Sequence, residues 1–201
     1  MGTKYFGIWL LGYVPVARIA LDIDSTLHPY WDLLQRIVLE RYGLELPYEE
    51  QYAWGITGLE RDAVIHCVEE SHSDENILAG IPYENAVETV RDWHEQGHWI
   101  HVTSHRRPQT ATATTDWLNK IGMPFDDLHC SFDKVTRCAE LGIHVLVDDS
   151  PINIVRAREA GIVPATILHP WNREVVERDG VIGADGWLEL KRKLAPVLAE
   201  L

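Results

Sequence analysis

Residues 16–26 read VARIALDIDST, a short apolar run that ends in two carboxylates separated by one residue. Apolar and β-branched residues dominate the run, which is typical of a strand buried on both faces of a parallel sheet. Side chains that follow such a strand lie at the carboxyl edge of the sheet, where α/β proteins place their active sites. The stretch therefore predicts a central strand that carries Asp22 and Asp24 into a functional site.

The chain after this strand alternates between helical and strand patterns. Helical spacing is found in residues 85–96, 108–121, 134–141 and 152–160, and each helical stretch is followed by a short apolar run, in residues 98–103, 128–132, 144–147 and 163–168. A terminal helix is expected from about Gly186. Repeated units of this kind predict an α/β fold with a doubly wound, Rossmann-like parallel sheet.

The segment between the first strand and the next unit departs from this alternation. Residues 29–42 have apolar positions at helical spacing and end at Gly43, and residues 59–70 form a second helical stretch. We therefore predict a small helical cap, residues 27–82, inserted into a core formed by residues 16–26 and 83–201. Residues 1–15 are an N-terminal extension to which the sequence assigns no role.

Composition excludes several classes of protein. The chain has 201 residues, 46% of them hydrophobic, which suits one domain or a domain with a small insertion. Its net charge of −13 repels phosphate backbones and anionic lipid, so general nucleic-acid binding and membrane binding are not expected. Three cysteines without a CxxC pair indicate neither a disulfide framework nor a thiolate zinc site, and a reducing cytoplasm fits best.

Polar side chains follow four of the predicted strands and therefore meet at one edge of the sheet. They are Asp22 and Asp24, Thr103 and Ser104, the turn that holds Lys134, and Asp148 and Asp149. Buried carboxylates repel one another unless a cation joins them, and oxygen ligands of this type favour Mg²⁺. Lysine and hydroxyl groups would hold phosphoryl oxygens, so the set has the parts that phosphoryl transfer needs.

In this order the residues resemble the four motifs of the haloacid dehalogenase-like superfamily. The resemblance covers roughly residues 16–168, with Asp22-Ile23-Asp24-Ser25-Thr26 as motif I, Thr103 as motif II, Lys134 as motif III and Asp148-Asp149 as motif IV. It implies a phosphatase in which Thr103 and Lys134 complete a catalytic set with the two aspartates of motif I.

The resemblance also implies a role for each aspartate. Asp22 would be the nucleophile that becomes an aspartyl-phosphate, and Asp24 would protonate the leaving oxygen and then activate water. The implied Mg²⁺ ligands are Asp22, the backbone carbonyl of Asp24, Asp149 directly and Asp148 through water. The reverse assignment of Asp148 and Asp149 stays open.

Residues 101–108, HVTSHRRP, and residues 147–151, VDDSP, further resemble the cytosolic type C branch of 5′(3′)-deoxyribonucleotidases. That branch carries a small helical cap between motifs I and II, which matches residues 27–82 in size and position. The resemblance implies a nucleoside monophosphate as the small phosphorylated substrate. Ser104 and Arg106 are the expected phosphate or substrate contacts, and Trp31 and Trp54 are candidates for stacking on the base.

Other functions are compatible with the same motifs. The substrate could be another phosphorylated metabolite or a phosphate at the end of a macromolecule, and the phosphoryl group could go to a second substrate instead of water. A non-catalytic regulatory module that binds Mg²⁺ is a further alternative. The sequence is also compatible with a homodimer.

Overall fold

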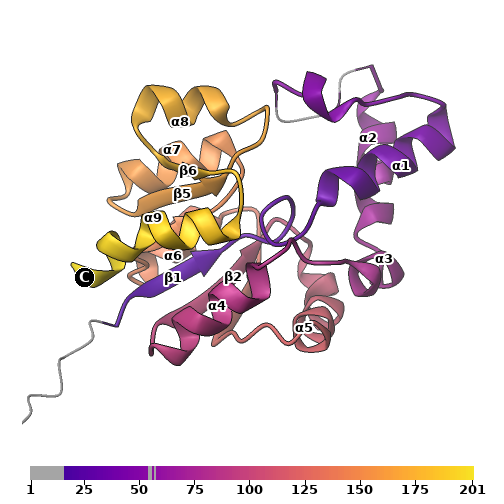
Figure 1. Cartoon of the computed structure of the whole chain (residues 1–201). Helices are drawn as coiled ribbons and strands as arrows, with labels where there is room; N and C mark the ends of the chain where they lie inside the picture. Colours follow the sequence, from indigo (N-terminus) through magenta and orange to yellow (C-terminus); the bar gives the residue numbers. More distant parts are fainter. Residues whose placement is uncertain (1–15, 54–55, 57) are drawn as a thin grey trace, which may run out of the picture.

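The computed structural model describes residues 16–53, 56 and 58–201. The N-terminal extension and Trp54 lie outside these residues. The elements in chain order are β1 (Arg18–Leu21), α1 (Tyr30–Tyr42), η1 (Tyr48–Glu50), α2 (Arg61–Ser71), α3 (Asp74–Ala79), α4 (Ala86–Glu95), β2 (Trp99–Ser104), η2 (Pro108–Thr110), α5 (Ala111–Lys120), β3 (Asp127–Cys130), α6 (Lys134–Glu140), β4 (Val145–Val147), α7 (Pro151–Glu159), β5 (Val163–Ile167), α8 (Arg173–Asp179), β6 (Ile182–Ala184) and α9 (Trp187–Ala199) (Figure 1).

The described strands form one parallel sheet in the order β3-β2-β1-β4-β5-β6. The predicted doubly wound α/β fold is therefore confirmed. The chain winds outward from β1 in both directions, and the point where the winding reverses lies between β1 and β4. Folds of this type bind ligands outside the carboxyl ends of the strands at that point.

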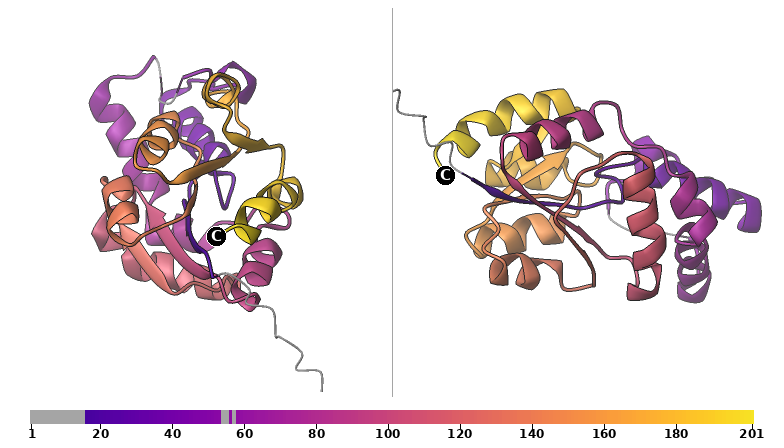
Figure 2. Two further views of the ribbon diagram at one scale, coloured as in Figure 1. Left: turned by 90° about the vertical axis from the view of Figure 1, so that its left-hand side faces the viewer. Right: turned by 90° about the horizontal axis from the view of Figure 1, so that it is seen from below.

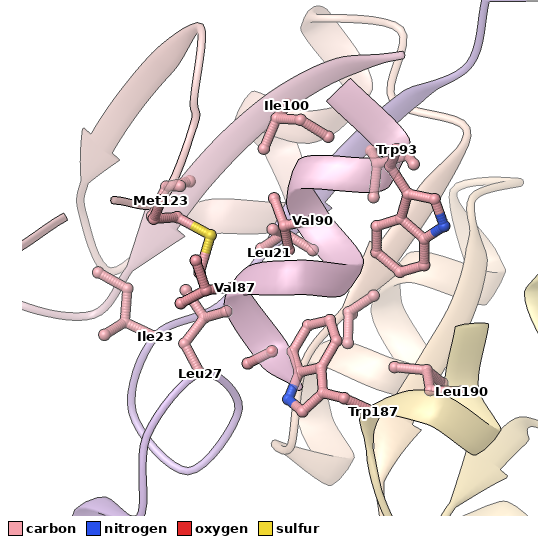
Figure 3. Close-up of a cluster of buried hydrophobic side chains, with 14 of the residues drawn as sticks. Leu21, Ile23, Leu27, Val87, Val90, Trp93, Ile100, Met123, Trp187 and Leu190 are labelled. Atoms are coloured by element: carbon pink, nitrogen blue, oxygen red, sulfur yellow. The ribbon is translucent and has the colours of Figure 1, made fainter. Parts of the chain in front are cut away.

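Successive side chains of β1 point to opposite faces of the sheet, and the core therefore has two layers. Leu21 points into a cluster that α4 and α9 cover, where Val90, Trp93 and Trp187 are almost fully buried (Figure 3). Ala20 points to the opposite face and packs in a second cluster with residues of α6 and α7. Because both faces of the sheet are covered, Ile19, Ala20 and Leu21 of β1 are buried, directly before the polar residues that follow the strand.

The helices α1 to α3 lie beyond one end of the sheet, away from the C-terminus (Figures 1 and 2). The two ends of this insertion meet, since the backbone N–H of Tyr83 donates to the carbonyl of Leu27 at 2.8 Å. Apolar positions of α1 form a separate cluster with Cys67 of α2 and with Trp171, which follows β5. The division into a cap and a core stays a prediction. No helix in the described part of the chain is long and apolar enough to cross a membrane.

Strand β6 and helix α8 were not predicted from the sequence. The strand has three residues and includes Gly183, so it gives no clear alternating pattern. Glycine is needed there because a Cβ would lie 2.8 Å from side-chain atoms of Leu168 and of Val176 in α8. Gly183 allows β6 to pack closely against α8, but a glycine at this position also removes the alternating apolar pattern by which a strand is predicted from sequence.

Candidate active site

The register of the central strands brings three acidic residues together. Leu21 in β1 pairs with Val147 in β4, so Asp22 and Asp148 occupy the next position on neighbouring strands. The backbone N–H of Asp22 donates to the carbonyl of Val147 at 2.8 Å. Asp22, Asp148 and Asp149 are all buried, and each offers a carboxylate oxygen within 4.8 Å of the others.

Lys134, the first residue of α6, lies between two of these acids. Its ammonium group is 2.8 Å from Asp22 Oδ1 and 2.8 Å from Asp148 Oδ2, and it is 1% exposed. Burial alone would lower the pKa of Lys134, but the carboxylates of Asp148 and Asp22 raise it above its ordinary value. The lysine is therefore a fixed positive charge inside the site.

One ammonium group does not balance the acids around it. Burial raises the pKa of Asp22 to about 7, with Asp148 and Asp24 adding to the effect and Lys134 opposing it. Burial, followed by the charges of Asp22 and Asp148, also raises the pKa of Asp149 well above its usual range. A divalent cation would neutralise this excess of negative charge, and a set of carboxylate oxygens is the donor chemistry that Mg²⁺ prefers. The residues present therefore fit a magnesium ion.

We expect Mg²⁺ to stabilise the folded protein more at pH 8 than at pH 5. The pKa of Asp22 in the folded protein is about 7, against an ordinary value of 3.8, so the folded state binds more protons between these values. Without a divalent cation, stability should thus fall as the pH rises through this window. The metal requires deprotonated ligands, so it should restore more stability at the higher pH. Thermal unfolding with and without MgCl₂ measures the effect, and an equal rise in Tm at both pH values would contradict it.

The two acids of motif IV have different partners. Asp148 Oδ1 accepts hydrogen bonds from the backbone N–H of Ser150 and the amide of Asn153, at 2.9 and 3.1 Å. Its Oδ2 is bonded to Lys134 and to the same amide. Because both oxygens of Asp148 are used by protein donors, this geometry favours Asp149 as the direct metal ligand. That assignment stays a prediction.

Asp24 is held by a cation in the loop that follows the neighbouring strand, β2. The guanidinium of Arg106 donates from Nε to Asp24 Oδ2 at 3.1 Å and from Nη2 to Oδ1 at 2.7 Å. His28 Nε2 lies 2.9 Å from Oδ1, and His72 Nε2 lies 3.3 Å from Oδ2. Burial would raise the pKa of Asp24, but Arg106, His72 and His28 hold it well below its usual range. As a carboxylate, Asp24 can accept a proton from water, whereas donation to a leaving oxygen requires that it be protonated first.

The motif I loop turns sharply after Asp24. Ser25 has a φ of 61°, which is uncommon for a residue with a side chain. The backbone N–H of Ser25 donates to the carbonyl of His28 at 3.0 Å, which closes the turn. This turn returns His28 toward the carboxylate of Asp24.

The polar residues at the end of β2 are buried. Thr103 is fully buried, and its hydroxyl has no hydrogen-bond partner within the part of the chain that the structure describes. Leaving such a hydroxyl unsatisfied is costly, and a phosphoryl oxygen is one group that would satisfy it. The hydroxyl of Ser104 lies 3.5 Å from Asp24 Oδ2 and accepts from the backbone N–H of Arg106 at 3.2 Å. Whether Ser104 and Arg106 contact a substrate stays a prediction.

A cavity of about 440 Å³ opens onto the acids. Asp22, Asp24 and Asp149 lie at its polar end, and its other walls are largely apolar. Four aromatic side chains line the cavity, two from α1 and two from loops at the edge of the sheet: Tyr30, Trp31, Phe132 and Trp171. The structure thus places Trp31 in the same cavity as the acids. A second hollow of about 600 Å³, near Tyr83 and Trp187, contains none of the four motifs.

The loop after β5 was not predicted to belong to the site, and it reads His169-Pro170-Trp171-Asn172. His169 Nε2 lies 2.7 Å from the carbonyl of Ser25, and Trp171 Nε1 donates to Asp149 Oδ2 at 3.0 Å. The side-chain amide of Asn172 donates to the carbonyl of Asp149 at 3.2 Å. The loop leaves the carboxyl end of a strand beside β4, so the rule that identified the other polar residues would have pointed to it.

Known proteins resemble the chain at low sequence identity. No family model matches the chain. A protein named "Putative 5′(3′)-deoxyribonucleotidase" from Chlorobaculum tepidum is 24% identical over 190 residues, which cover 88% of this chain and 91% of the relative.

Solved structures share the fold at low sequence identity. A HAD family hydrolase from Deinococcus radiodurans R1, with bound phosphate and sodium, has a TM-score of 0.64 and 18% identity over 93% of this chain and 96% of its own. A "predicted phosphatase" from Clostridium acetobutylicum has a TM-score of 0.67 and 12% identity, over 90% of this chain and 99% of its own. These likenesses show that the chain has the fold of these hydrolases, and the residues of its four predicted motifs lie at one edge of the sheet.

Proposed function

We propose that the protein is a Mg²⁺-dependent phosphomonoesterase that forms an aspartyl-phosphate on Asp22. The observation that carries this proposal is the buried cluster of Asp22, Asp148, Asp149 and Lys134 at the polar end of a cavity. The cluster joins a nucleophile, a fixed cation and a set of metal ligands in a space that a small substrate can enter. Phosphoryl transfer needs these parts and little other covalent chemistry from the protein.

In the proposed reaction, a carboxylate oxygen of Asp22 attacks phosphorus and the bond to the leaving oxygen breaks. Arg106, His72 and His28 hold Asp24 as a carboxylate, so Asp24 must first take up a proton, which it then gives to the leaving oxygen. Asp24, now a carboxylate, then takes a proton from the water that attacks the aspartyl-phosphate, and Asp22 is restored with release of phosphate. Lys134 keeps Asp22 oriented throughout, because its ammonium group also binds the neighbouring Asp148.

The residues that would hold Mg²⁺ are Asp22, the backbone carbonyl of Asp24, Asp149 and, through water, Asp148. The bound ion would supply positive charge against the phosphoryl oxygens. Positive charge is needed there because the described residues that line the cavity include neither lysine nor arginine. Thr103 is proposed to complete the catalytic set through its buried hydroxyl.

Nucleoside monophosphates are the proposed substrates. The named function of the relative from Chlorobaculum tepidum supports this choice. The cavity supports it independently, since Tyr30, Trp31, Phe132 and Trp171 offer flat apolar surfaces to a base. The described residues of the cavity wall include no lysine or arginine, which also favours a single phosphate over a chain of phosphates.

Replacing Trp31 with alanine is expected to raise the KM for nucleoside monophosphates by about 10-fold, because a base–aromatic stack contributes about 1–3 kcal/mol. The KM for glycerol phosphate, which has no base, should change much less. Steady-state kinetics on both substrates measure the difference. Equal losses on both would show that Trp31 serves the packing of α1 and contacts no base.

Phosphate release across a panel of phosphomonoesters tests the proposed function. The panel should contain ribo- and deoxyribonucleoside monophosphates, sugar phosphates, phosphorylated peptide and oligonucleotide ends, and an aryl phosphate, each with and without Mg²⁺. Selective release from nucleotides supports the full proposal. Release from other phosphates alone keeps the mechanism and overturns the nucleotide assignment, and no release from any of them overturns both.

A further inference from the structure

Trp171 connects the candidate metal site to the helices inserted after β1. Its indole N–H donates to Asp149 Oδ2 at 3.0 Å, inside the acidic cluster. Its ring packs in the hydrophobic cluster that contains Trp31, Leu34 and Cys67. The side chain is 6% exposed, so both ends of the indole are enclosed.

The orientation of the Trp171 ring is set by other aromatic rings. It stacks on His169 with 4.5 Å between centroids and 4° between planes. Tyr48 meets it edge-on at 5.8 Å, and Trp31 lies at 5.7 Å. His169 is itself fixed, because its ring nitrogens lie 2.6 Å from the hydroxyl of Tyr48 and 2.7 Å from the carbonyl of Ser25. A ring held in this way has one direction in which its N–H can point.

The hydrogen bond from an indole differs from the contacts that Asp148 receives. Lys134 brings a positive charge to Asp148, whereas Trp171 brings a neutral donor to Asp149. A neutral donor restricts the rotation of a carboxylate and leaves its negative charge in place. Residues in this position behind a metal ligand typically change metal affinity by about 10- to 100-fold when they are lost.

We infer that Trp171 is a positioning residue for the metal site, whose indole N–H orients the Asp149 carboxylate to bind Mg²⁺. The inference rests on the Mg²⁺ site of the proposed function. Because the ring also packs against α1, this orientation depends on how the inserted helices sit over the sheet. Trp171 thereby links the cavity wall to the metal ligand.

The variant Trp171→Phe tests the inference because it keeps a ring and removes the N–H donor. Trp31→Phe is the matched control, since it makes the same change in the same cluster but removes a bond to the backbone carbonyl of Leu46. Calorimetric titration with MgCl₂, without substrate, should show Mg²⁺ affinity reduced by about 10-fold in Trp171→Phe. The affinity of Trp31→Phe should stay close to that of the unmodified protein.

A second measurement is made on the unmodified protein and does not depend on the Mg²⁺ affinity of the variants. The chain has eight tryptophans, and loss of a peak in each Phe variant assigns the indole N–H resonances of Trp171 and Trp31. During titration with Mg²⁺, the Trp171 resonance should shift more than the Trp31 resonance. A tryptophan that serves packing alone would not show this difference.

Three results would overturn the inference. Equal weakening of Mg²⁺ binding in Trp171→Phe and Trp31→Phe would assign the effect to ring packing, and unchanged binding in Trp171→Phe would show that the N–H has no role. If the unmodified protein bound no Mg²⁺, the metal site itself would be absent. These measurements involve no turnover, so their failure can be told apart from failure of the phosphatase proposal, which is tested by phosphate release.

Discussion

Asp22→Asn is expected to lower kcat at least about 1,000-fold, because an amide cannot form the aspartyl-phosphate. The protein should remain folded, since the change removes a buried acid whose pKa of about 7 shows that its charged form is disfavoured. Lys134 keeps its contact with Asp148 in the variant. Loss of turnover with an unchanged or higher Tm would therefore separate a chemical role from a structural one.

Asp62→Asn is the matched control for this variant. Asp62 is exposed in the first turn of α2, and its replacement should leave both kcat and Tm nearly unchanged. Turnover by Asp22→Asn at a rate close to that of the unmodified protein would contradict the assignment of the nucleophile. Loss of the folded structure in Asp22→Asn would contradict the charge balance described for the site.

Lys134→Met is expected to destabilise the protein by about 3–5 kcal/mol and to abolish turnover. The variant leaves Asp22, Asp148 and Asp149 buried without their internal cation. The loss of stability should be smaller at pH 5 than at pH 8, because the acids left behind can be protonated at the lower pH. Urea unfolding at the two pH values measures the difference.

A surface lysine provides the comparison for Lys134. Lys191 pairs with Asp92, but both side chains are partly exposed, so Lys191→Met should cost less than about 1 kcal/mol. Addition of Mg²⁺ should recover part of the stability that Lys134→Met loses, because the metal replaces some of the missing positive charge. Equal costs for the two lysine variants would contradict a buried electrostatic role for Lys134.

The carboxyl edge of the sheet could be predicted because its signals are local. Asp22 follows a run of mostly apolar residues, and Asp148 and Asp149 follow another, so the polar residues at each strand end can be found from the sequence beside them. A parallel sheet then brings these ends together without further information. The structure places Lys134 with them because α6 begins at that residue, directly after the turn that follows β3.

The partners of these residues could not be predicted in the same way. His72 directly follows α2 and Arg106 follows β2, yet both reach Asp24, and no spacing in the sequence relates the three. A tryptophan in the sequence can pack in a core or donate a hydrogen bond. Only the folded structure shows that Trp171 does both. Contacts that depend on how the inserted helices meet the sheet are set by tertiary structure and leave no periodic pattern.

Identification of the residue that carries the phosphoryl group tests whether Asp22 is the nucleophile. The phosphomonoester that the panel shows to be turned over fastest is labelled in its phosphate, mixed with enzyme and Mg²⁺, and quenched in acid within one turnover. We predict that the label is found on the peptide that contains Asp22 and is absent from the Asp22→Asn variant. Label on another residue, or full phosphate release without any labelled peptide, would contradict the account.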